Sequence, residues 1–355
     1  MSGPLSEYSD YIPSDLFQAL VAQNIATLPA LIFASPTILF HRLPTGCTTL
    51  RELTGVISHL TKLASAEGVT GEELANAQDR VVSGEVVTGV ETLDALVGGG
   101  FGGPKNGKVI EVAGDSGTGK TALALHIVLR HLSTHADSAT LWMDTTGELS
   151  PERLSILLPS YSGSGVPTLL NRLHVSHAFN ISAAYTLLEN LHAVLMTAGD
   201  AGSPPSPRII IIDTVTSLLG PLLNAMSSEG HAIMTDFMRT LRILAQDYGL
   251  SVLVLNNGTQ CIPHNPASVF ASTTRKPALG PSFAFLTDAT LWLARSPSHV
   301  STTSGRQHRS HPDTAGPGGY REEGGLRVAE VFRSRISRSQ AWCPFRINGG
   351  VVTDV

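Results

Sequence analysis

Short apolar runs alternate with longer helix-like segments along most of the chain after residue 86. In the longer segments the apolar positions recur with helical spacing, whereas the runs are only six or seven residues long. Short buried strands that alternate with amphipathic helices are typical of a mostly parallel sheet with helices on both faces. The sequence therefore predicts an α/β core. Its predicted strands are residues 108–114, 139–144, 172–177, 208–213, 250–256 and 289–294, and its predicted helices are residues 119–132, 180–197 and 229–248.

The segment before this alternation predicts a small all-helical domain over residues 1–65. Ser14 or Asp15 is placed to cap a first helix, and Thr49 with Glu52 forms a capping-box pair before a later one. The apolar positions assigned to these helices are Leu16, Phe17, Leu20 and Val21 in the first and Leu53, Ile57 and Leu60 in the later one.

Two polar segments mark boundaries in the chain. Residues 66–85 are polar and charged, which predicts a linker between the helical domain and a core over residues 86–355. Residues 296–325 are rich in Ser, Gly, Pro and His and carry almost no apolar side chain. We interpret them as a disordered insertion within the core.

Residues 16–40 contain no charged side chain, which raises the question of a membrane span. Gln18, Gln23 and Asn24 would place polar groups in the bilayer, and Pro29 and Pro36 would interrupt a spanning helix. We therefore expect two or three short buried helices here and no contact with a membrane.

Composition limits the classes of protein that remain. With 42% apolar and 15% charged residues, the 355-residue chain can fold as a globular protein. Its net charge of -5 gives no overall basic field, so binding to nucleic acid would need a local patch. Three widely spaced cysteines indicate a reducing compartment, and acids near the start argue against a secretion signal. The pairs Cys261/His264 and His308/His311 are each half of a metal site, and we interpret them as solvated loop residues.

Residues 114–121 read GDSGTGKT and match the phosphate-binding pattern G-x-x-x-x-G-K-[ST]. A predicted strand precedes the motif and a predicted helix follows it, which is the context that the pattern requires. The glycines let backbone N–H groups converge on phosphate oxygens, and the helix N-terminus favours an anion. Lys120 is expected to reach the β- and γ-phosphates and Thr121 to ligate Mg²⁺. The predicted ATP-binding residues are Gly114, Asp115, Ser116, Gly117, Thr118, Gly119, Lys120 and Thr121.

A partner for the magnesium ion ends the most apolar predicted strand. Asp213 follows four isoleucines, and we expect it to hold Mg²⁺ through a water molecule. The segment TGVETLDALVGGG, residues 88–100, lies shortly before the motif. It could form a tight turn over the base of the nucleotide, although turn structure alone would also explain its glycines.

The surroundings of these motifs narrow the class of P-loop protein. The lysine and aspartate that a GTPase uses to read guanine are missing from the nearest candidate, LNNGT, and no arginine-rich lid of a nucleotide kinase is evident. The arrangement instead resembles the RecA-like recombinases, in the branch of Rad51 and its paralogues, and most closely the D-type paralogue. The segments that carry the resemblance are TGVETLDALVGGG, GDSGTGKT, MDTTGELSPERL, RIIIIDTVTS, GHAIMTDFMRTLRILAQDYGLSVLVLNN and KPALGPSFAFLTDATLWL. It implies a RecA-like P-loop ATPase core after the small helical domain.

The resemblance also implies where ATP hydrolysis would fail. Active members carry a glutamate that orients the attacking water, and Thr146 stands at that position here. General-base help worth roughly 10²–10⁴-fold should therefore be missing. The family's γ-phosphate sensor, a glutamine, falls at Asn257. Glu148 is a possible substitute base, although a solvated loop residue is the simpler interpretation. We expect ATP to be bound firmly and hydrolysed slowly.

DNA contact is implied by the family and poorly supported by the residues. The first loop that binds DNA in the family contains no cation, since His231 is the only basic residue between Ile209 and Met238. The second loop offers only Arg275 and Lys276 as DNA-binding candidates. Further charge is carried by Arg327, Arg333, Arg335, Arg338 and Arg346, which alternation in VAEVFRSRIS places in part on the polar face of an edge strand.

Two hypotheses follow, and a third class stays open. The first is an ATP-binding accessory factor in homologous-recombination DNA repair, located in the nucleus, which assembles with other recombinase-like paralogue subunits on single-stranded DNA. The second is a competent DNA-dependent ATPase that forms its own filament. Thr146, Asn257 and the first loop favour the first hypothesis. A RecA-like signalling or clock-type ATPase that binds no DNA is the third.

Overall fold

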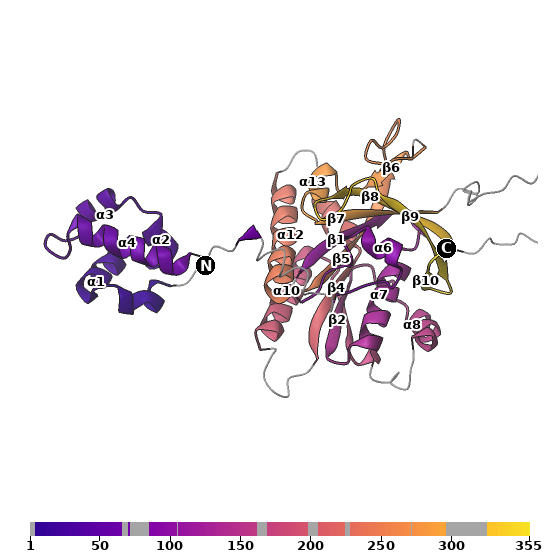
Figure 1. The fold of residues 1–355 in the computed structure, drawn as a ribbon, viewed down its shortest axis with the longest axis horizontal. Helices are drawn as coiled ribbons and strands as arrows, with labels where there is room; N and C mark the ends of the chain where they lie inside the picture. Colours follow the sequence, from indigo (N-terminus) through magenta and orange to yellow (C-terminus); the bar gives the residue numbers. More distant parts are fainter. Residues whose placement is uncertain are drawn as a thin grey trace, which may run out of the picture. The chain divides into compact units, whose positions relative to one another are not determined.

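The structure is a computed structural model that describes residues 4–65, 70–71, 85–104, 106–161, 169–197, 205–223, 228–270, 272–295 and 325–355. The chain divides into two compact units, residues 1–80 and residues 81–355 (Figure 1). Almost all of the predicted linker and of the predicted insertion lies outside the described residues. Gly325, assigned to the insertion, instead accepts a hydrogen bond from the Ile347 N–H at 3.0 Å.

Short helices form the N-terminal unit. They are the 3₁₀-helix η1 (Leu5–Tyr11) and the α-helices α1 (Ser14–Ala22), α2 (Leu28–Ile32), α3 (Pro36–Arg42) and α4 (Leu50–Ala64). Pro29 and Pro36 lie in the first turns of α2 and α3, where a missing N–H costs nothing. The expectation of short helices in the uncharged stretch is thus confirmed. Within the described residues, no helix combines the length and apolar character needed to cross a membrane.

One of the two predicted helix caps is present. The Thr49 N–H donates to the Glu52 carboxylate at 2.8 Å, and the Glu52 N–H donates to Thr49 Oγ1 at 3.2 Å, which is the predicted capping box. The cap of α1 was assigned wrongly, because Pro13 holds the N-cap position and Ser14 is already helical. The assigned apolar residues Leu16, Leu20, Leu53, Ile57 and Leu60 are buried, whereas Val21 is exposed.

The second unit is built on a ten-stranded sheet of described residues in the order β10-β9-β8-β7-β1-β5-β4-β2-β3, with β6 paired to β5 off this path. The parallel part confirms the predicted α/β core. It contains β1 (Lys108–Gly114), β2 (Ser138–Asp144), β3 (Leu173–His177), β4 (Ser206–Asp213), β5 (Ser251–Gln260) and β7 (Ala289–Arg295). The antiparallel strands are β6 (Arg275–Pro277), β8 (Leu326–Ser334), β9 (Trp342–Asn348) and β10 (Val351–Thr353). The edge-strand assignment was wrong, because β8 lies between β7 and β9.

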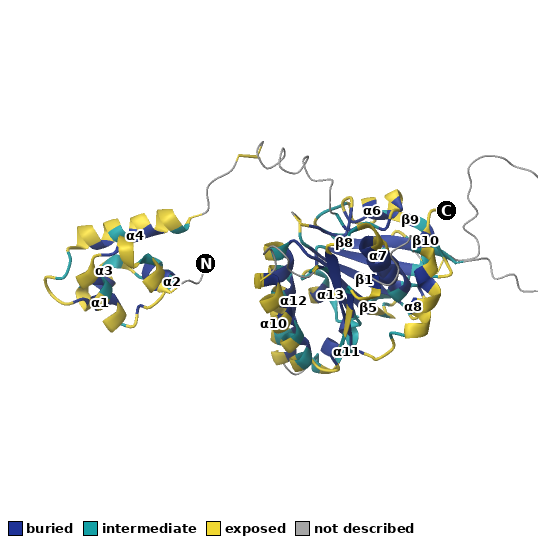
Figure 2. Ribbon diagram, turned by 90° about the horizontal axis from the view of Figure 1, so that it is seen from below, coloured by how far each residue is buried: buried dark blue, intermediate teal, exposed yellow. Residues whose placement is uncertain are grey.

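Helices cover both faces of this sheet, and the isoleucine run shows why (Figure 2). Ile209 and Ile211 pack into one hydrophobic cluster, and Ile210 and Ile212 pack into the other. A strand buried on both faces needs apolar side chains at every position. The first cluster includes residues of α6 (Glu91–Ala95), α7 (Lys120–Thr134) and α8 (Pro151–Leu157). The second includes residues of α10 (Ile181–Thr197), α11 (Val215–Leu219) and α12 (Glu229–Tyr248). Short elements complete the unit, namely η2 (Leu158–Ser160), η3 (Gly220–Leu222) and α13 (Pro281–Ala284).

The glycine-rich segment before β1, residues 88–100, packs against α7. The Asp94 carboxylate accepts hydrogen bonds from the Thr88 N–H at 2.8 Å and the Gly89 N–H at 3.1 Å, which closes the turn. The Thr88 carbonyl lies 2.8 Å from His126 Nε2 on α7. Side chains of this segment also join the first hydrophobic cluster. These contacts account for a tight turn without any nucleotide.

Candidate nucleotide-binding site

The glycine loop leaves the centre of the sheet and enters α7. It follows β1, whose last residue Gly114 pairs with Asn257 of β5 and with Leu293 of β7. A Cβ atom on Gly114 would lie 2.5 Å from the Leu293 carbonyl oxygen. Gly117 and Gly119 have φ angles of 74° and 106°, which side-chain-bearing residues rarely adopt. The loop therefore needs glycine at these positions, and it ends at the N-terminus of a 15-residue helix.

The single lysine of the loop is held over it. The Lys120 ammonium donates to the Gly114 carbonyl at 2.8 Å and to the Asp115 carbonyl at 3.0 Å. Burial lowers the pKa of Lys120, while the carboxylates of Asp213 and Asp115 act in the opposite direction. A buried cation at the N-terminus of a helix is well placed to bind phosphate. The cradle and this charge fit the triphosphate of ATP.

Thr121 and Asp213 lie together at the loop, as a magnesium site requires. Thr121 Oγ1 donates to Asp213 Oδ2 at 3.0 Å, although the two residues are far apart in the sequence. Burial raises the pKa of Asp213 to about 6, and the neighbouring Asp144 carboxylate adds to the shift. Both groups are oxygen ligands, which Mg²⁺ prefers, and a cation here would offset the cost of the buried carboxylate. The pair fits Mg²⁺, with Thr121 bound to the ion and Asp213 acting through water as the predicted roles.

Thr146, predicted to stand at the position of the family's glutamate, lies on an exposed turn held by Asp144. Asp144 ends β2 directly beside Asp213 in the register of β2 and β4. Its carboxylate accepts from the N–H groups of Thr146 at 3.0 Å, Gly147 at 2.8 Å and Leu149 at 3.1 Å. Burial alone would raise the pKa of Asp144, but these N–H groups outweigh it and lower the pKa. Asp144 thus shapes the turn on which Thr146 is exposed.

Glu148 is the other candidate base, and it is exposed on the same turn. Its negative charge makes a small contribution to the raised pKa of Asp213. The Thr146 hydroxyl lies 3.4 Å from Asp144 Oδ1. The geometry therefore brings Thr146, Glu148 and Asp213 to the same end of the sheet. That Thr146 takes the place of the family's carboxylate stays a prediction from the sequence.

The sensor position is tied to a buried polar network that the sequence did not reveal. The Asn257 N–H donates to Thr216 Oγ1 at 2.9 Å, and Thr216 Oγ1 donates to Asn256 Oδ1 at 2.6 Å. Asn256 Nδ2 in turn donates to the Glu111 carboxylate at 2.6 Å, which also accepts from Thr290 Oγ1. Burial raises the pKa of Glu111 to about 7. The presence of Glu111 within an apolar strand was the one feature of the sequence that could have indicated this network. The network fixes β5 relative to β1 and α11.

One of the two cations that the sequence assigned to DNA lies instead at the glycine loop. Arg275 makes an ion pair with Asp115 of the glycine loop, whereas Lys276, its neighbour on β6, is only partly buried. Two arginines that sequence analysis missed at this site also reach the loop. Arg295 Nε donates to the Gly117 carbonyl at 3.3 Å, and Arg327 Nε donates to the Thr118 carbonyl at 3.2 Å. They flank the predicted insertion, so the ends of β7 and β8 meet at the loop.

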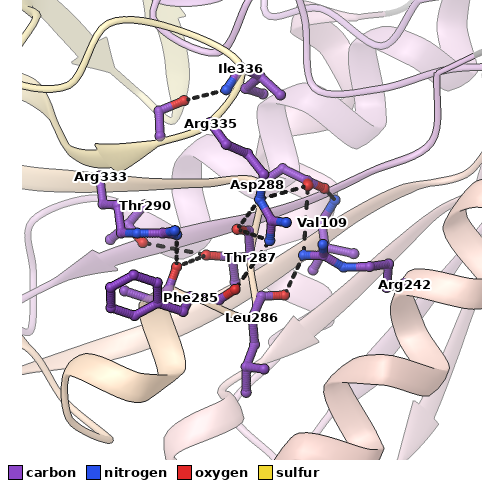
Figure 3. A network of polar contacts seen from close by, with 12 residues as sticks. Val109, Arg242, Phe285, Leu286, Thr287, Asp288, Thr290, Arg333, Arg335 and Ile336 are labelled. Carbon is purple, nitrogen blue, oxygen red and sulfur yellow. Dashed lines mark hydrogen bonds and ion pairs between the residues drawn. The ribbon is translucent and has the colours of Figure 1, made fainter.

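Arg333 of β8 and Arg335 just after it have structural contacts, shown in Figure 3. Arg333 donates to the Ala284 carbonyl at 2.5 Å, and its guanidinium lies 3.9 Å from the Phe285 ring centroid. Arg335 donates to the Thr287 carbonyl at 2.9 Å and lies 3.5 Å from the Asp288 carboxylate. These side chains fix the turn before β7. Their charge is largely committed within the fold.

Comparison with known proteins places the core in a family. The profile of the Rad51 family matches residues 79–300, more than half of the chain. The mouse protein described as DNA repair protein RAD51 homolog 4 is 30% identical over 208 residues, which is 58% of this chain and 59% of that protein. The bovine protein of the same description is 30% identical over 221 residues, or 62% and 64%. The matches thus span less than two thirds of these relatives.

A solved structure supports the same fold. The crystal structure of the RadB recombinase superposes with a TM-score of 0.54 at 21% sequence identity, covering 76% of this chain and 99% of that one. At that identity the likeness concerns the fold alone, and it agrees with the RecA-like arrangement of a mostly parallel sheet between helices. The family match, the fold and the placement of the glycine loop agree, and the chain belongs to the Rad51 family.

Proposed function

We propose that this chain is a Rad51 paralogue of the D type that binds ATP and Mg²⁺ and acts as an accessory factor in homologous-recombination DNA repair in the nucleus. One observation carries the proposal. The glycine loop and the Thr121–Asp213 contact form a cradle for phosphate and Mg²⁺, while Thr146, at the position that the resemblance assigns to the water-orienting carboxylate, is exposed beside it. A site with these properties binds ATP firmly and hydrolyses it slowly.

Assembly with other recombinase-like subunits is the second part of the proposal. The relatives are described as DNA repair proteins, which supports a role in repair and a nuclear location. The N-terminal unit exposes the large apolar side chains Phe33 and Ile38, with exposed fractions of 86% and 63%. Apolar surface of this kind supports docking between subunits. We propose that the N-terminal unit and the segment after it hold the partner.

Single-stranded DNA is proposed as the shared ligand of the assembly, with a minor contribution from this chain. Arg275 is paired with Asp115, and the described part of the first loop carries no lysine or arginine. Affinity for nucleic acid depends mainly on cations that contact phosphates. We therefore expect this chain alone to bind DNA weakly and with a shallow salt dependence.

Nucleotide binding and turnover, measured on the same protein, test this proposal against its alternatives. The purified chain is assayed alone and with recombinase-like partner subunits, each with and without single-stranded DNA. The proposal expects tight ATP binding and slow turnover that DNA does not accelerate in the isolated chain. Strong acceleration by DNA would favour the competent DNA-dependent ATPase, for which Glu148 near Asp213 is the supporting observation. Absence of DNA binding even with partners would favour a signalling ATPase.

A further inference from the structure

An acidic residue stands in a loop that is built to attract phosphates. Asp115 is the second residue of GDSGTGKT, and a carboxylate there would repel a triphosphate held by the neighbouring N–H groups. The Asp115 side chain is 40% exposed, so water screens only part of this repulsion. The loop can bind a polyanion well only if the charge of Asp115 is offset.

Arg275 provides that offset from a distant part of the chain. Its Nε atom donates to Asp115 Oδ1 at 2.9 Å and to Oδ2 at 3.1 Å, and its Nη2 atom also donates to Oδ1. A two-armed contact of this kind is the strongest form of arginine–carboxylate pair. The hydrogen bonds that Arg275 donates to Asp115 raise the pKa of Arg275, as expected for a guanidinium stabilised in its charged form.

The fold holds both partners in place. Gly258 of β5 leaves the space for Asp115, because a Cβ atom there would lie 2.3 Å from Asp115 Oδ1. The Gly258 carbonyl accepts a hydrogen bond from Arg275 Nη2 at 3.2 Å, and Asn265 Nδ2 donates to the Arg275 carbonyl at 3.0 Å. Arg275 lies opposite Gln260 in the register of β5 and β6. The guanidinium is therefore positioned by strand pairing and by hydrogen bonds on either side.

We propose that Arg275 is a positioning residue of the nucleotide site, which neutralises Asp115 so that the glycine loop can hold a triphosphate. This inference rests on the proposed binding of ATP. It takes Arg275 away from the role of a DNA contact and gives the second loop, which begins beyond β5 and ends at β6, a direct link to the nucleotide. The link operates through charge: Arg275 improves phosphate binding by cancelling a carboxylate and without touching the phosphates.

Three variants separate this role from the others that Arg275 could have. They are Arg275→Gln, Asp115→Asn and the double variant, and Kd values for ATP and ADP are measured by calorimetry in magnesium buffer. We expect Arg275→Gln to weaken ATP binding about tenfold, a change of about 1.4 kcal/mol, with a smaller loss for ADP. Asp115→Asn should bind ATP as tightly as the parent or more tightly. The double variant should return to within about twofold of the parent.

The restoration in the double variant is the decisive readout. If the pair were only a structural latch, Asp115→Asn would weaken binding as much as Arg275→Gln. If Arg275 touched the phosphates itself, the double variant would bind as weakly as Arg275→Gln. Either result overturns the inference, as does unchanged affinity in Arg275→Gln.

Controls distinguish a failure of this inference from a failure of the proposed function. Arg239→Gln removes an exposed arginine of α12 and should leave the Kd unchanged, which excludes a general effect of net charge. If Arg275→Gln melts at a lower temperature than the parent, Arg275→Lys is used in its place. This variant keeps the positive charge and should retain most of the affinity for ATP. A parent protein that binds no ATP overturns both the proposed function and the inference. A parent that binds ATP while Arg275→Gln binds equally overturns the inference alone.

Discussion

Asp213 is expected to destabilise the folded protein in the absence of a cation. Its pKa is raised from 3.8 to about 6, chiefly by burial and with help from Asp144, so ionising it in the folded state is costly. A tenfold change in an acid dissociation constant corresponds to about 1.4 kcal/mol, so a rise of this size would amount to about 3 kcal/mol. Because water reaches part of this side chain and screens the charge, we expect about 1–3 kcal/mol.

The Asp213→Asn variant tests this reasoning. A carboxyl with a raised pKa favours the folded state below pH 3.8 relative to neutral pH, and that advantage is lost as the pH rises through about 6. The variant cannot ionise, so it should be more stable than the parent at about pH 7.5 in magnesium-free buffer. The gain corresponds to a few degrees in Tm, and it should shrink towards about pH 4.

Asp144→Asn is the matched control, because the pKa of Asp144 is lowered whereas that of Asp213 is raised. The pKa of Asp144 is lowered by three N–H groups, so its ionised form stabilises the fold above pH 3.8. This variant should be less stable than the parent at about pH 7.5. Thermal unfolding of both variants between about pH 4 and pH 8 measures the effects. An Asp213→Asn protein that is no more stable than the parent at about pH 7.5 would refute the reasoning.

Two further predictions concern binding and stability. Lys120→Ala should weaken ATP binding by roughly 1.5–3 kcal/mol, because it removes a charge-assisted contact to phosphate; equal affinity in calorimetry would contradict the phosphate-site assignment. Replacing residues 296–324 with a short Gly-Ser loop should lower Tm by less than about 5 °C, since they carry little apolar surface to bury; a larger drop in calorimetric scans would show that the segment packs.

Two-sided burial explains why much of the fold was predictable from the sequence. Strands such as β4 need apolar side chains at every position, and that leaves a clear signal. The strands β9 and β10 were missed because they are only partly buried, and Pro344 interrupts the β9 pattern. The position of β8 inside the sheet depends on its pairing with β9, which local alternation cannot reveal.

The candidate site was predictable where its residues belong to recognisable local motifs. The glycine loop is local, and its geometry follows from the glycines. Thr121 and Asp213 were each assigned to Mg²⁺ from their own motifs, because Thr121 ends the glycine loop and Asp213 ends a very apolar strand, and the structure brings the two side chains into contact. The pair of Asp115 and Arg275 was not expected, because 160 positions separate the two residues and no local pattern links them. Arg275 looked like a loop cation available to DNA.

The most direct test of the central claim is ATP turnover in Thr146→Glu, measured together with ATP affinity. A carboxylate at this position acts on the attacking water and not on the ground-state phosphates. We therefore expect turnover to rise while the Kd for ATP stays nearly unchanged. The gain should fall short of the full general-base factor, since Asn257 is shorter than the family's glutamine. Thr146→Ala should change turnover little. A large loss of hydrolysis in Thr146→Ala or in Glu148→Gln would contradict slow turnover and show that the chain has a working catalytic arrangement of its own.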